Sequence, residues 1–170
     1  MVATVVNDPE NFDKIANIFP DRKERKYIDA DFETRRKVLK AIAELNVDIY
    51  EITYNKLGLD LEGAKKKGEH YQKQSEELLS TIFNNDDSYC VDILFDETSL
   101  INKRELKFVE MCFNTARFHN KNIIWLEMGK SSGNRTLQVQ DYPTGVMGAL
   151  RNHRILDDET QELFELSKIA

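Results

Sequence analysis

The stretch YCVDILFDETS, residues 89–99, decides the fold class because it contains the clearest strand in the chain. Its first seven residues are mostly aliphatic, β-branched or aromatic, which is the composition of a buried strand. The apolar run then stops at Asp96 and Glu97, and turn-forming residues follow. In open α/β sheets the carboxyl ends of strands border the ligand crevice, so acidic residues here are well placed for chemistry. The alternative at this point is a strand-end acid that only begins a turn.

Further strand-like runs and helix-like segments alternate on both sides of this stretch. Runs rich in β-branched residues predict strands at residues 1–6, 47–54 and 122–128. Apolar residues at helical spacing predict helices between the strands. The predicted helices fall within residues 9–19, 32–45, 71–83, 106–116, 137–151 and 156–170, the last as a C-terminal tail. Strands separated by helices of a dozen or more residues imply parallel crossovers, so we expect an α/β sheet with flanking helices in a single domain, residues 1–170.

Three local patterns refine this outline. Leu106, Val109, Phe113 and Ala116 share helical spacing and mark the apolar face of their helix. The basic, glycine-containing segment 56–68 is expected to be a loop. The two cysteines, Cys90 and Cys112, lie in apolar patterns and do not form a disulfide framework, so we expect two buried thiols.

Composition excludes some classes of protein. The formal net charge of −6 argues against a chain that wraps along nucleic acid by overall charge, but it does not argue against local basic patches. No apolar run approaches the roughly 18 residues that a membrane-spanning helix needs, and no signal-peptide pattern opens the sequence. We therefore expect a cytoplasmic protein without a membrane partner.

A second region whose residues could form part of a functional site is LQVQDYPTGVMGALRNHR, residues 137–154. Gly145, Gly148 and Ala149 are small residues within one helical stretch. Glycine inside a helix costs about 1 kcal/mol relative to alanine, so a close approach of another element, such as a sheet, would explain the pattern. Asp141 precedes these small residues. Two interpretations of Asp141 stand side by side at this point, a helix cap and a functional carboxylate.

Five segments together resemble one known family, one of them the helix-like DADFETRRKVLKAI, residues 29–42. The other four are Glu24 with Lys26, FDETS at residues 95–99, Lys130-Ser131-Ser132, and the segment 137–154. Their types and order resemble the ribonuclease-H-like family called domain of unknown function 3800, over roughly residues 2–154. The sequence departs from the family pattern where Gln140 replaces an alanine and where Pro143 intrudes.

A further departure concerns the family's first strand. Family members open with a strand that ends in an aspartate-glutamate-serine-glycine motif, ahead of the strand that residues 1–6 resemble. Met1 begins at that second strand, so the family's first metal-binding acid has no counterpart. The resemblance thus implies a ribonuclease-H-like mixed sheet that lacks its first, central strand. A missed upstream start, a partner chain that supplies the strand, and a shortened remnant are the three explanations, and we favour the first.

The chemistry implied by the resemblance is divalent-metal-dependent hydrolysis of phosphodiesters, with Mg²⁺ or Mn²⁺ as cofactor. Asp96 and Asp141 are the implied metal ligands, and Glu24 is a weaker third candidate. Lys130 is implied as a contact for a phosphate or for the scissile oxygen. The opening acid has no counterpart, so we expect this chain to have little or no nuclease activity.

The implied partners follow from the same resemblance. Nucleic acid is the implied substrate, and Arg151 and Arg154, which follow the small-residue segment, are candidates for phosphate contacts. A homo-oligomer or a partner chain could supply the missing strand. Two rival interpretations remain: a non-catalytic binding or assembly module that keeps the fold, and an unrelated small α/β protein in which Asp96 and Asp141 serve as turn and cap.

Overall fold

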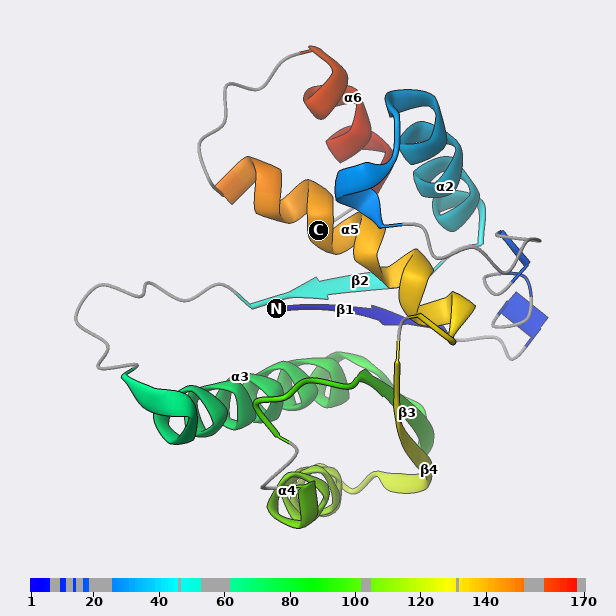
Figure 1. Ribbon diagram of the computed structural model, residues 1–170. Helices are drawn as coiled ribbons and strands as arrows, with labels where there is room; N and C mark the ends of the chain where they lie inside the picture. The colour runs from blue at the N-terminus through cyan, green and yellow to red at the C-terminus, as the bar shows by residue number, and fades with distance from the viewer. Residues whose placement is uncertain are drawn as a thin grey trace. The chain divides into compact units, whose positions relative to one another are not determined.

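The computed structural model (Figure 1) gives a mixed α/β protein, as the sequence predicts. The described residues are 1–6, 10–11, 14, 17–18, 26–45, 47–52, 62–101, 105–130, 132–151 and 158–167. Their elements are β1 (Val2–Val5), the short 3₁₀ helix η1 (Tyr27–Asp29), α2 (Phe32–Glu44), β2 (Asp48–Glu51), α3 (Gly63–Asn85), β3 (Cys90–Asp96), α4 (Glu105–Phe118), β4 (Asn122–Gly129), α5 (Arg135–Arg151) and α6 (Asp158–Ser167). The helix predicted within residues 9–19 lies largely outside the described residues. Among those described, no helix is both long enough and apolar enough to cross a membrane.

The chain divides into two compact units. The first consists of Met1 with Glu51–Met128, and it contains α3, β3, α4 and nearly all of β4. The second consists of Val2–Tyr50 and Gly129–Ala170, and it contains β1, η1, α2, α5, α6 and nearly all of β2. The expectation of a single domain stays a prediction.

β1 and β2 form a two-stranded antiparallel sheet. Met1 precedes β1 and Ile52 follows β2, and these two residues exchange both backbone hydrogen bonds, at 2.7 and 2.9 Å. Such a reciprocal pair is typical of antiparallel strands, and the two arrows point in opposite directions in Figure 1. The predicted parallel crossover is therefore wrong for this pair. A long connection permits either strand direction, so its length alone could not decide.

β3 and β4 form the second two-stranded sheet, and they run parallel. The backbone N–H of Asn122, the first residue of β4, donates to the carbonyl of Tyr89, just before β3, at 2.8 Å. The two strands therefore begin at the same end, with α4 as the connection between them. This part of the fold agrees with the predicted crossover, and it places the carboxyl ends of β3 and β4 at one edge.

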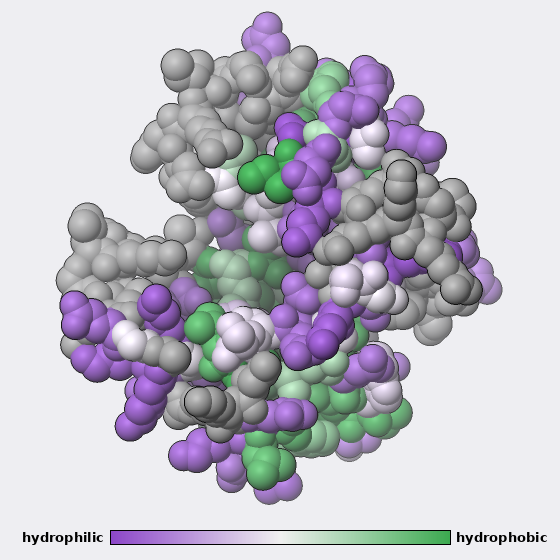
Figure 2. Space-filling model, viewed as in Figure 1, coloured by the Kyte–Doolittle hydropathy of each residue, from purple (hydrophilic) through white to green (hydrophobic). Residues whose placement is uncertain are grey.

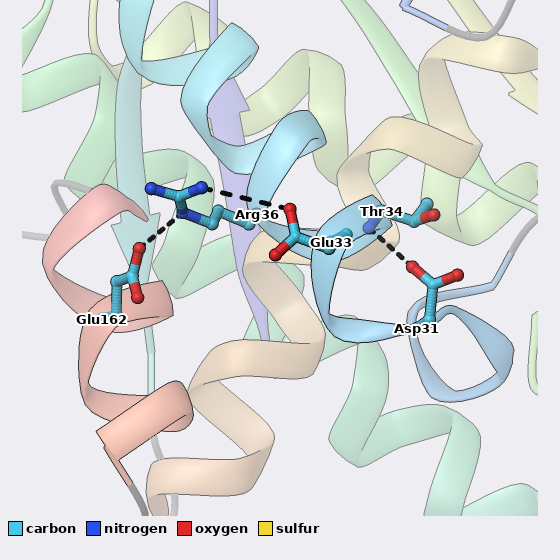
Figure 3. Close-up of polar contacts among 5 residues, drawn as sticks. All are labelled: Asp31, Glu33, Thr34, Arg36 and Glu162. Atoms are coloured by element: carbon cyan, nitrogen blue, oxygen red, sulfur yellow. Dashed lines mark hydrogen bonds and ion pairs between the residues drawn. The ribbon is translucent and has the colours of Figure 1, made fainter.

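The second unit is built around α2, α5 and α6. Asp31 caps α2, since its Oδ1 accepts from the backbone N–H of Thr34 at 2.7 Å. Figure 3 shows this cap together with the pair between Arg36 Nε and Glu162 Oε1, 2.5 Å apart, which joins α2 to α6. The predicted tail helix is thus packed against the rest of its unit, with Leu163 buried. The core of this unit contains Val38, Leu39, Ile42, Ile49, Val139, Tyr142, Val146 and Leu163.

α3 begins earlier than the sequence suggests. It starts at Gly63, whose φ of +83° suits glycine, so the loop predicted over residues 56–68 is wrong from Gly63 onward. Lys65, Lys66 and Lys67 are therefore exposed on the first turns of a helix. Lysine is a good helix former. The unfavourable free energy of one glycine, Gly68, inside the helix is smaller than the stabilisation that the rest of this long helix provides.

α4 buries a different face from the one predicted. Its buried residues are Phe108, Met111, Cys112, Thr115 and Ala116. Leu106 is 85% exposed and Phe113 is 45% exposed, so the predicted stripe is wrong at these two positions. The helix carries apolar residues on two faces, and spacing alone does not say which of them packs inward.

The two cysteines also differ from each other. Cys112 is fully buried in α4, as expected, and burial raises the pKa of its thiol to about 12. Cys90 begins β3 and is exposed, so the expectation of a buried thiol is wrong there. The thiolate is the reactive form of cysteine, so the two side chains should differ strongly in reactivity.

We predict that one thiol per chain reacts rapidly with an aromatic disulfide reagent in the native protein at mildly alkaline pH. Cys90→Ser should abolish this fast reaction, and Cys112→Ser should leave it unchanged. Absorbance of the released thiolate is the measurement, and the second thiol should appear only after denaturant is added. Two fast thiols in the folded protein would contradict this assignment of burial.

Candidate functional site

Asp96 is the last residue of β3, and it lies exposed at the carboxyl end of the parallel strand pair. Aromatic side chains fix the strand just before it. The ring of Phe95 makes an edge contact with the fully buried Phe108 of α4, with centroids 4.8 Å apart. The ring of Tyr71 on α3 lies 6.0 Å from that of Phe108. The exposed carboxylate of Asp96 therefore comes directly after a residue that is packed in an aromatic cluster.

Tyr71 is a neighbour of Asp96 that the sequence did not single out. Burial, together with the negative charge of Asp96, raises the pKa of the Tyr71 hydroxyl above its ordinary value. The buried Ser75, one turn further along α3, donates to the Tyr71 carbonyl at 3.0 Å. Sequence spacing could not reveal the pairing of Tyr71 with Asp96, because α3 and β3 meet only in the folded unit.

The structure places Asp141 inside α5, seven residues into the helix Arg135–Arg151. It is therefore not the cap of its own helix. Asn134 has that position, with its side-chain oxygen accepting from the backbone N–H groups of Thr136 and Leu137, at 3.0 and 3.2 Å. Instead, Asp141 Oδ2 accepts from the backbone N–H of Tyr27, the first residue of η1, at 2.8 Å. The carboxylate thus satisfies the N-terminus of another helix, 114 positions away in sequence.

Tyr27 is held from several directions besides this hydrogen bond. Arg35 Nε donates to its carbonyl at 2.9 Å, and the guanidinium carbon lies 4.5 Å from the centroid of its ring. The Tyr27 ring meets that of the buried Tyr142 edge-on at 5.9 Å. These contacts make Tyr27 the residue through which η1 and α2 reach Asp141. Sequence reasoning named its neighbours Glu24 and Lys26, and it missed Tyr27 itself.

Gly145 makes the closest approach in this cluster. A side-chain carbon placed there would lie 2.2 Å from Cδ1 of Tyr27, which is far inside contact distance. The predicted close approach is confirmed at Gly145, but its partner is the ring of Tyr27 and not a sheet. At Gly148 a side-chain carbon would meet nothing within 4 Å, so the prediction is wrong at that position.

Gln140, where the sequence departs from the family pattern, ties α5 to β1. Its Nε2 donates to the carbonyl of Val2 at 3.3 Å, and its Oε1 accepts from the hydroxyl of Thr4. Pro143, the other departure, lies fully buried inside α5. The two unusual residues flank Asp141 and Tyr142, so they help to fix the part of α5 that presents the carboxylate.

Lys130 is the one remaining predicted site residue whose side chain the structure describes. Lys130 is exposed immediately after β4, the strand that pairs with β3. Arg151 is the last residue of α5, and its side chain lies outside what the structure describes, as do Glu24 and Arg154 entirely. Asp96 belongs to the first unit and Asp141 to the second.

The donors available to a metal ion are carboxylate oxygens. In the described part of the chain, no three His, Cys, Asp or Glu side chains gather closely enough to hold an ion together. Mg²⁺ usually keeps several waters and takes only one or two protein carboxylates together with substrate phosphates. Asp96 and Asp141 are of the right chemical type for such a hard cation.

A comparison of this chain with protein-family models, with curated proteins and with solved structures finds no match.

The contact between Gly145 and Tyr27 leads to a prediction about stability. Gly145→Ala should lower the free energy of unfolding by about 1–3 kcal/mol, because the added carbon would overlap the tyrosine ring. Gly148→Ala is the matched control in the same helix. It should be neutral or raise stability by up to about 1 kcal/mol, because alanine favours the helix and meets no neighbour. Chemical denaturation followed by circular dichroism measures both, and equal effects would contradict the described packing.

Proposed function

We propose that this chain is a ribonuclease-H-like protein that acts on phosphodiesters with the help of a divalent cation, and that Asp96 and Asp141 are its metal ligands. The observation that carries the proposal is the position of Asp96. It is an exposed carboxylate at the carboxyl end of two paired parallel strands, directly after a packed aromatic cluster. This is the edge at which α/β sheets usually bind ligands.

Orientation of the second carboxylate also supports the proposal. Ligating carboxylates in metal sites are usually hydrogen-bonded by a second group that fixes their direction. Asp141 has such a partner, since the backbone N–H of Tyr27 holds its Oδ2 at 2.8 Å. A backbone donor cannot rotate away as a side chain can, so this contact limits the directions in which Oδ1 can point.

The cation, when bound, would supply activation of water and stabilisation of the leaving oxygen. The residues of the chain would do the positioning. Lys130, exposed at the end of β4, has the charge to contact a phosphate oxygen. Burial and the charge of Asp96 raise the pKa of the Tyr71 hydroxyl, so this neighbour of Asp96 would add no negative charge of its own. The proposed substrate is therefore an anionic phosphodiester of nucleic acid.

A second candidate is a non-catalytic assembly module. The observation favouring it is that each described sheet has only two strands. Two-stranded sheets are marginal by themselves, and the edge of a sheet can accept a strand from another chain. A partner chain would then complete the sheet, and the strand-end carboxylate would serve only as a turn. Metal binding separates the two candidates.

We predict that the full chain binds Mn²⁺ and that Asp96→Asn weakens this binding by about tenfold or more, since an amide is a poorer ligand than a carboxylate. Isothermal titration calorimetry measures the affinity. Asp92→Asn is the matched control, because Asp92 is also exposed in β3 and lies on the same face of the strand. This control should retain the affinity of the unaltered chain.

Activity gives a second measure on the same variants. Any metal-dependent cleavage of single-stranded, duplex or hybrid substrates should be lost in Asp96→Asn and retained in Asp92→Asn. Cleavage that survives Asp96→Asn, or an equal loss in both variants, would remove Asp96 from the proposed site. Failure of the unaltered chain to bind Mn²⁺ would favour the assembly module.

A further inference from the structure

α4 has a second apolar face that the described part of the first unit leaves uncovered. Leu106, Glu110, Phe113 and Arg117 follow one another at intervals of four, three and four residues, so they form a single ridge along the helix. All four are exposed, and Leu106 and Phe113 are large apolar residues. Figure 2 shows apolar side chains on the surface of this unit, over α4 and β4 at the lower edge of the view.

The two charges on this ridge are placed on opposite sides of Phe113. Glu110 lies one turn before it, and Arg117 lies one turn after it. Seven residues of helix separate the two charges by about 10 Å along the axis, which is too far for an ion pair within the helix. Within the described parts of the chain, neither residue forms an ion pair with another side chain. The ridge therefore has a negative half and a positive half around an apolar centre.

We propose that this ridge is a self-association surface on which α4 of a second copy packs antiparallel. In an interface with two-fold symmetry, the same patch of both copies meets, and each contact occurs twice. A two-fold axis beside Phe113 brings the two Phe113 rings together. The same axis places Glu110 opposite Arg117 of the second copy, and Arg117 opposite Glu110 of that copy.

Charge complementarity is the argument for a second copy as the occupant. The chain has a formal net charge of −6, so two copies repel each other at long range. An interface between copies therefore needs local attraction that is correct only in one register. The order negative, apolar, positive is complementary to itself when reversed, and it supplies two such pairs together with burial of Phe113. Complementary charges of this kind fix register and specificity more than they fix affinity.

Complementary charge variants test the proposal. The unaltered chain should sediment as a dimer at high micromolar concentration, and Glu110→Arg and Arg117→Glu should each weaken dimerisation by about tenfold or more, because both pairs become like charges. An equimolar mixture of the two variants should regain the dimer, because each variant chain then meets the opposite charge on its partner. The double variant Glu110→Arg/Arg117→Glu should also dimerise. Sedimentation velocity measures each state.

Lys107→Glu is the control, since Lys107 is exposed on α4 but lies away from the ridge. It should leave the dimer intact, and circular dichroism should show that all variants remain folded. A monomeric unaltered chain would overturn the proposal. A dimer that neither single variant weakens, or a mixture that fails to recover association, would overturn it as well. None of these outcomes depends on metal binding or on catalysis.

Discussion

The hydrogen bond from the backbone N–H of Tyr27 to Asp141 is the polar contact that ties η1 to α5 in the second unit. It joins a carboxylate inside α5 to the first residue of η1, across 114 positions of sequence. The contact requires α5 to approach closely, and Gly145 permits this because it has no side chain to meet the Tyr27 ring. Arg35 then holds the other end of Tyr27 through its carbonyl and its ring face. The carboxylate thus adds a directional contact to the apolar packing of η1, α2 and α5, and the same contact orients it as a prospective ligand.

Much of the local structure could be predicted because it depends on neighbouring residues. The strand at residues 89–95 and the helix around Asp141 both have short-range signals that the structure confirms. The direction of β2 relative to β1 had no such signal, since a long connection allows either arrangement. The same reason applies to the partner of Asp141. The sequence gives no sign that Asp141 accepts a hydrogen bond from a backbone N–H more than a hundred residues away. A cap at the start of its own helix is therefore the explanation that the local sequence offers for Asp141.

α4 shows a different limit of prediction. Its sequence has apolar residues on two sides, and the spacing of Leu106 and Phe113 is as regular as that of the residues that pack inward. Periodicity identifies a helix but cannot choose between two apolar faces, because that choice depends on what lies opposite each of them. Phe108 faces the aromatic cluster that precedes Asp96, whereas Phe113 faces outward between two opposite charges. One helix therefore serves both the proposed metal site and the proposed interface between copies.

Cation binding by the Asp96 and Asp141 carboxylates is the central proposal, and paramagnetic broadening tests it most directly. Substoichiometric Mn²⁺ added to ¹⁵N-labelled protein broadens the amide signals of residues near the bound ion. Signals around Asp96 and signals around Asp141, including that of Tyr27, should weaken at the lowest Mn²⁺ concentrations. Broadening confined to one of these two groups, or seen first at another acidic stretch such as Asp86-Asp87, would contradict it.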